Sequence, residues 1–292
     1  SSPVSFPIVP NRWYHVATTF NGSTGKINLY LNGENINSET DAGLSLNTNT
    51  YNFTIGKSAN TGLADDSFKG YIDEVRVFNK TLSDNEIHKM VYQEIEDNSG
   101  TIRGRIIPRD ITDFINPTTI NPLNWNSLIR YYRMDVYKGN IIDDLTTPLL
   151  DVDAGAKIFN VKLIDYQTAP MPFITQASGN LPDSVNIPSD GVHGNDAVTY
   201  DWSIVQVNHN NVSFDDHQYH LGLLIEELDS NSNPIKYAVT DDSELNISWY
   251  LKLNGFIDLE GESQLVQNLD SDLLVGPAGR IEKDQQGTRD LF

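Results

Sequence analysis

Apolar and polar residues alternate in short runs along the first third of the chain. Residues 27–31 place Ile, Leu and Leu on one side and polar or aromatic residues between them, which predicts a strand with one buried face. Asn32-Gly33 follows at once, and this dipeptide is a strong signal for a two-residue hairpin turn. Residues 51–55 repeat the alternation and end at Gly56, so we expect a further strand there.

One segment, residues 84–93, has the signals of a helix. Ser83 and Glu86 have the spacing of a capping box, and Leu82 and Ile87 occupy the two positions of a hydrophobic staple. The helix is short and amphipathic, so we expect it to close an edge of a sandwich.

The next segment is polar and rich in proline, which breaks regular elements. β patterning returns at residue 127 and continues in the runs 198–208 and 219–227. The organisation expected is a first β domain over 1–96, a connector over 97–126 and a second β-rich region over 127–292.

Residues 249–286 have a different hydrophobic pattern, because their apolar residues come in pairs with Gly255, Gly261 and Gly276 between them. This spacing is typical of the rungs of a β-solenoid. The fold class expected is therefore all-β: an antiparallel β-sandwich followed by a β-rich region, either a second sandwich or a sandwich running into solenoid rungs. The pairs are Leu251/Leu253, Ile257/Leu259 and Leu265/Val266.

The composition limits the classes of partner and of site that we expect. The formal net charge of −20 disfavours nucleic acid and anionic membranes as partners, but it suits divalent cations. No apolar run is long enough to span a bilayer, so we expect no membrane insertion. The chain has no cysteine, which excludes disulfides and thiolate sites.

Four segments in order (RWYHVA, GKINLYLNG, FKGYIDEVRVF and LSDNEI) resemble the C-terminal half of a laminin G-like, concanavalin A-like jelly-roll domain. The resemblance covers about residues 8–95. Residues 127–146 resemble the opening strand of the same family, and they either begin another copy or complete this one. The sequence pattern of the remaining chain resembles that of modular surface proteins of gliding bacteria. That resemblance implies export by the type IX route and a location at the cell surface. It also implies that the partners are the export machinery or neighbouring domains of a larger protein.

Asp73 is the main candidate site residue, because alternation places it on the apolar face of a strand with Val75 and Val77. The laminin G-like resemblance implies a calcium ligand at this position, and the loop that precedes it supplies Asp65 and Asp66 as further oxygens. The alternative is that backbone amides satisfy the Asp73 carboxylate.

The other candidate site residues have simpler structural interpretations. Trp13 and His15 are expected to pack in the core rather than to bind a sugar or a metal. His209, His217 and His220 have a spacing that needs a loop to bring them to one metal ion.

The sequence contains no motif of a nucleophile elbow, a zinc protease or a phosphate loop, so we expect no enzyme activity. The function expected is adhesion or gliding, as part of a large secreted or cell-surface adhesin that binds a glycan or another surface ligand with calcium as cofactor. Two alternatives stay open, a structural spacer that binds nothing and an accessory module of a polysaccharide-degrading enzyme.

Overall fold

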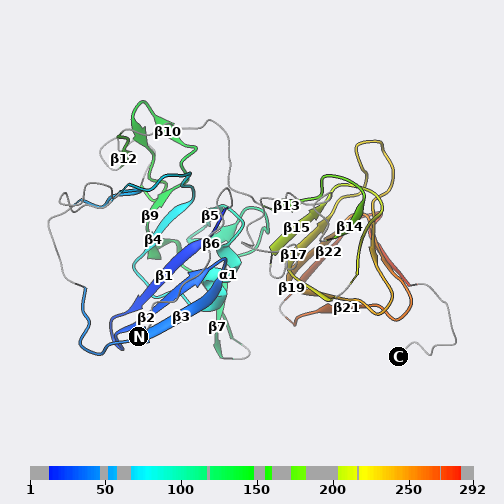
Figure 1. Ribbon diagram of the computed structural model, residues 1–292, viewed down its shortest axis with the longest axis horizontal. Coiled ribbons are helices and arrows are strands. Elements are labelled where there is room, and N and C mark those ends of the chain that lie inside the picture. The colour runs from blue at the N-terminus through cyan, green and yellow to red at the C-terminus, as the bar shows by residue number, and fades with distance from the viewer. Residues whose placement is uncertain are drawn as a thin grey trace.

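The secondary structure is almost entirely β (Figure 1). None of the helices in the described part of the chain is long and apolar enough to cross a bilayer. The computed structural model describes residues 13–46, 52–57, 67–116, 119–147, 155–159, 172–181, 203–215, 217–269 and 271–283.

The first sheet is antiparallel, with strand order β1-β2-β3. The predicted Asn32-Gly33 hairpin is confirmed: both residues have positive φ, 50° and 88°, and they join β2 to β3. The second alternating run is different, since residues 52–56 form no strand and only Lys57 bridges to Ser67. The strands are β1 (Val16–Asn21), β2 (Lys26–Leu31) and β3 (Glu34–Thr40).

The helix α1 (Asp84–Met90) begins where the sequence predicts. Ser83 Oγ accepts from the Glu86 backbone N–H at 3.2 Å, and Glu86 Oε2 accepts from the Ser83 N–H at 3.0 Å, so the capping box is present. The helix ends earlier than predicted, because Val91 is extended and Tyr92 has a φ of 66°.

Strand β4 (Val75–Phe78) pairs antiparallel with β9 (Leu128–Tyr132). The segment that resembles an opening strand therefore lies beside the strand that contains Val75 and Arg76 of the Asp-Glu-Val-Arg motif. Of the two alternatives for this segment, the pairing favours completion of the first β domain over the start of another copy.

Residues 97–126, the predicted connector, take part in two antiparallel hairpins. Their isoleucines Ile102, Ile107 and Ile111 are completely buried, so this segment contributes to the core. The domain boundaries remain a prediction. The hairpin strands are β5 (Ile95–Asn98), β6 (Thr101–Gly104), β7 (Thr112–Asn116) and β8 (Thr119–Pro122), followed by the 3₁₀ turn η1 (Trp125–Ser127) and the small sheet β10 (Tyr137–Lys138), β11 (Ile141–Ile142) and β12 (Ala156–Lys157).

The C-terminal strands form two parallel sheets, and the chain alternates between them from β13 to β21 (Figure 1). Buried residues stack in columns, such as Val212, Tyr237 and Ile257 in consecutive turns. The topology is that of a parallel coil, whereas its membership of a solenoid class remains a prediction. One sheet holds β13 (Phe173–Ile174), β15 (Ser203–Val207), β17 (His217–Ile225), β19 (Glu244–Leu253), β21 (Gln264–Gln267) and β22 (Asp272–Val275); the other holds β14 (Gly179–Leu181), β16 (Val212–Phe214), β18 (Lys236–Val239), β20 (Phe256–Leu259) and β23 (Arg280–Lys283).

The hairpin region packs against the parallel coil, and buried residues of both belong to one hydrophobic cluster. A Cβ on Gly222 would lie 2.6 Å from Ile107 Cδ1, so glycine allows this close approach. Arg109 donates to the Trp249 carbonyl at 2.6 Å and stacks over its ring at 5.4 Å. These contacts join the two β regions.

Candidate functional site

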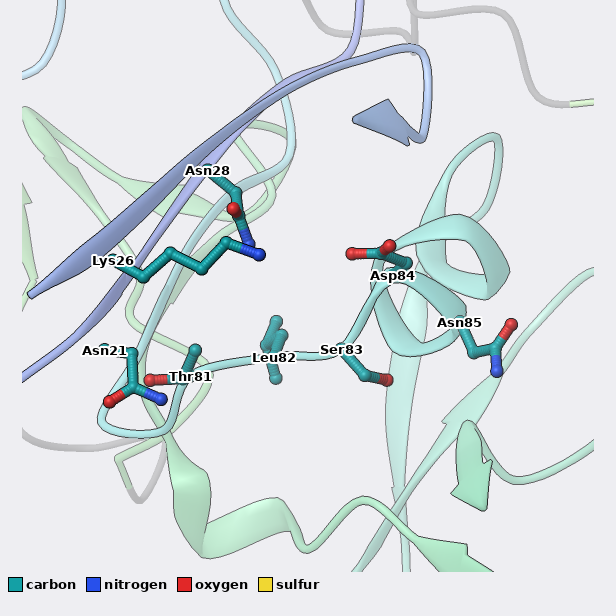
Figure 2. A pocket seen from close by; sticks show the side chains of 8 residues that line it. All are labelled: Asn21, Lys26, Asn28, Thr81, Leu82, Ser83, Asp84 and Asn85. Atoms are coloured by element: carbon teal, nitrogen blue, oxygen red, sulfur yellow. The ribbon is translucent and has the colours of Figure 1, made fainter. Parts of the chain in front are cut away.

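A polar pocket of about 550 Å³ lies between the β1–β2 hairpin and the start of α1 (Figure 2). This volume is in the range of small-ligand sites. Leu82 provides an apolar surface between the two sides, and the rest of the lining is polar. The lining residues are Asn21, Lys26, Asn28, Thr81, Leu82, Ser83, Asp84 and Asn85.

The hairpin side of the pocket presents amides and one ammonium group. Asn28 is fixed on both ends, because its Nδ2 donates to the Tyr30 hydroxyl at 3.1 Å and its Oδ1 accepts from Ser38 at 2.8 Å. Asn21 Oδ1 accepts backbone N–H groups of its own turn, which leaves its amide nitrogen for a ligand. The Lys26 ammonium makes no hydrogen bond or ion pair with the described residues.

The helix side of the pocket presents a carboxylate. Asp84 Oδ1 accepts from the Tyr30 hydroxyl at 2.6 Å. Burial, followed by this hydrogen bond, raises the pKa of Tyr30, so its hydroxyl stays protonated and donates. Figure 2 shows Lys26 and Asp84 reaching towards each other from opposite sides of the space.

This arrangement can bind a hydroxyl-rich ligand. Amide nitrogens and an ammonium donate hydrogen bonds, a carboxylate accepts them, and a sugar hydroxyl does both. Among the described residues no aromatic side chain lines the pocket. Recognition here would therefore rest on hydrogen bonds rather than on stacking of a sugar against an aromatic ring.

The structure changes the account of Asp73. Strand β4 starts at Val75 and Glu74 has a φ of 54°, so Asp73 is not on a common strand face with Val75 and Val77. Its carboxylate is half-buried and accepts from the Glu74 backbone N–H at 3.0 Å. Asp65 and Asp66 lie outside the described residues. The predicted calcium site therefore remains a prediction.

The neighbouring carboxylate, Glu74, takes part in a network of hydrogen bonds and an ion pair. Its Oε2 accepts from the Tyr131 hydroxyl at 2.8 Å and pairs with the Arg76 guanidinium. Arg76 also donates to the carbonyls of Met90 at 2.9 Å and Gln93 at 2.6 Å. The sequence does not predict this network, which joins β4, β9 and the end of α1. The alternation of Glu74 and Arg76 is its one signal in the sequence.

Trp13 and His15 are partly buried, so they lie at the edge of the core rather than fully inside it as the sequence predicts. Burial, followed by the positive charges of Arg76 and His88, lowers the pKa of His15 to about 3. Trp13 is partly buried against the hydrophobic cluster and contacts the Tyr71 ring at 6.2 Å.

Among the described residues, His209, His217 and His220 belong to no group of metal ligands. His209 shares a hydrogen bond of 3.0 Å with Thr175, and His217 and His220 lie on β17. Within the described ranges, no three His, Asp or Glu side chains come together as metal ligands.

Comparison with known proteins gives one match. A family model described as the concanavalin A-like lectin/glucanases superfamily, of the laminin G type, matches residues 2–88. The matched segment contains the polar pocket, and it supports a laminin G-like jelly-roll domain in this part of the chain. No curated protein and no solved structure matches.

Proposed function

We propose that this chain is the binding part of a secreted or cell-surface adhesin, and that its polar pocket binds a glycan. The pocket carries the proposal, because it gathers amide, ammonium and carboxylate groups within the segment that is similar to the lectin superfamily. Small-ligand sites are concave and combine a mostly apolar lining with a few convergent hydrogen-bonding groups; this pocket has the hydrogen-bonding groups, but Leu82 is the one apolar residue among the described residues that line it. The proposed role is adhesion or gliding at the bacterial surface, without catalysis.

Several observations support binding rather than a purely structural role. Asn28 and Asp84 are held in place by Tyr30 from behind the pocket, so their positions are fixed before a ligand arrives. Such preorganisation lowers the entropic cost of binding. The Lys26 ammonium, which has no partner among the described residues, gains one when a hydroxyl oxygen enters.

Calcium belongs to the proposal as a stiffening cofactor near Asp73. A half-buried carboxylate oxygen is a suitable hard ligand for this ion. Asp73, with Asp65 and Asp66, would hold the ion and tie the preceding loop to β4.

A glycan array followed by calorimetric titration of the best glycan tests the proposal. Asp84→Asn and Lys26→Gln each remove one charged hydrogen bond to the ligand, which contributes roughly 1.5–3 kcal/mol, so each should weaken binding at least tenfold. Lys138→Gln is the matched control, because Lys138 is an exposed lysine on β10, outside the pocket.

The outcomes separate the alternatives. No binding on the array would favour a structural spacer. Binding that Asp84→Asn and Lys26→Gln leave unchanged would place the glycan elsewhere and reject the polar pocket.

A further inference from the structure

A second pocket, of about 400 Å³, lies where the β5–β6 and β7–β8 hairpins meet the parallel coil. Four charged side chains line it: Arg103, Arg109, Asp110 and Asp272. Two positive and two negative charges give this pocket a formal charge of zero, whereas the whole chain carries −20. An anion therefore meets less repulsion here than over most of the surface.

Three of the four charged groups already have protein partners. Arg109 Nε pairs with Asp272 Oδ2 at 2.7 Å, and Arg109 Nη1 donates to the Trp249 carbonyl. Asp110 accepts from Asn98 at 2.9 Å and from Thr101 at 3.0 Å. These bonds leave both carboxylates engaged.

Arg103 is the exception. It lies on β6, is half-buried, and its buried Nε has no hydrogen-bond partner among the described residues. Its guanidinium makes no ion pair with the described residues, although Glu96 is its cross-strand neighbour. Glu96 approaches Arg105 instead, at 3.8 Å. The two Nη groups of Arg103 make no hydrogen bond with the described residues and are not among its buried unpartnered atoms, so they are the donors that a ligand can reach.

We propose that the pocket around Arg103 is a second ligand site, and that it takes the carboxylate of a uronic-acid saccharide. A guanidinium matches a carboxylate because its planar donors meet two oxygens at once. Ile120 and Pro122 line the same pocket and offer apolar surface to the C–H face of a sugar ring. The carboxylate part of this assignment rests on Arg103, and the saccharide part rests on the proposed function.

The test is calorimetric titration of the full chain with trigalacturonic acid and, separately, with its methyl ester. The ester has the same sugar frame without the charge, so this comparison needs no variant. Wild type should bind the acid at least tenfold more tightly than the ester, which corresponds to about 1.4 kcal/mol.

Variants locate the site. Arg103→Gln should weaken binding of the acid at least tenfold, and Arg103→Lys should restore part of it, because lysine keeps the charge and loses the planar fork. Lys138→Gln, an exposed lysine outside this pocket, should bind like wild type. Unchanged unfolding temperatures would show that the variants are folded.

Three results would overturn the second site: no binding of the acid by wild type, equal binding of acid and ester, or full binding by Arg103→Gln. Asp84→Asn separates this proposal from the first, since it should leave binding of the acid unchanged. A chain that binds neutral glycans but not trigalacturonate keeps the polar pocket and loses the Arg103 site. The reverse pattern keeps the Arg103 site and rejects the polar pocket.

Discussion

Two fully buried tyrosines allow the same chemical change to be made with opposite expected effects. Tyr131 donates to Glu74 at 2.8 Å and accepts from the Ile95 backbone N–H at 3.2 Å. Tyr237 is equally buried, lies 5.6 Å from the Phe214 ring, and its hydroxyl has no hydrogen-bond partner in the described structure. Replacement by phenylalanine removes only the hydroxyl in each case.

The magnitudes follow from these partners. Tyr131→Phe removes a hydrogen bond to a charged group, a contribution of about 1.5–3 kcal/mol, and leaves the buried amide of Ile95 without a partner, at a cost of about 1–3 kcal/mol. Because Arg76 still pairs with Glu74, the two effects do not add fully. We expect a net loss of about 2–4 kcal/mol. Tyr237→Phe removes an unsatisfied buried hydroxyl, so we expect a gain of about 1 kcal/mol.

Thermal unfolding followed by circular dichroism is the assay. One kcal/mol corresponds to about 2–4 °C in chains of this order of size, so Tyr131→Phe should lower the unfolding temperature by roughly 5–15 °C. Tyr237→Phe should raise it by roughly 2–4 °C. If Tyr131→Phe leaves the unfolding temperature unchanged, the hydrogen bonds of Tyr131 to Glu74 and Ile95 do not link β4, β9 and β5 as described. If Tyr237→Phe destabilises by a similar amount, its hydroxyl has a partner that the structure does not show.

Three further predictions concern other parts of the chain. Gly222→Ala should destabilise by about 1–3 kcal/mol because its Cβ would approach Ile107 Cδ1; Ile107→Val removes that atom, so a double-mutant cycle in urea should show partial relief. His15 has a lowered pKa in the folded state, so the unfolded chain binds more protons between pH 6.5 and 3, and stability should fall as pH falls through this window. Between pH 7 and 5 the free energy of unfolding should fall by at most about 2 kcal/mol for this reason. His15→Leu should reduce this pH dependence, measured by urea titrations; an unchanged pH dependence would assign it to other groups. Calcium at 100 times its dissociation constant should add about 2.7 kcal/mol in calorimetric unfolding, compared with EDTA; an equal gain in Asp73→Asn would exclude Asp73 as a ligand.

Local signals were predicted well because they act over a few residues. The Asn32-Gly33 turn and the capping box of Ser83 and Glu86 depend only on neighbours in sequence. The run over 51–55 shows the limit of such signals. A strand also needs a partner, and the described residues of this run have none; the nearest bridge is Lys57–Ser67, just after it.

Long-range pairing was harder to predict. The stacked column of Val212, Tyr237, Ile257 and Ile281 has separations of 25, 20 and 24 residues, from the differences of these numbers. Because loops of different length interrupt the turns, no fixed period appears in the sequence. The paired apolar residues indicated turns of a coil, but they could not give their register.

The candidate pocket was not predicted from the sequence at all. Asparagine, lysine and aspartate are ordinary in polar turns, and only the fold brings Lys26 and Asp84 to one space. The Arg103 pocket is similar, since Asp272 reaches it from a strand far along the chain. Sequence reasoning chose Asp73 instead, because alternation is visible in one strand without knowledge of the fold.

The most direct test of the account is hydrogen exchange of wild type with and without the best neutral glycan from the array. We predict slower exchange of backbone amides in residues 21–30 and 81–86, the two sides of the polar pocket. The parallel coil should be unchanged. Slowed exchange confined to the coil, or no change anywhere, would contradict the claim that this pocket binds glycans.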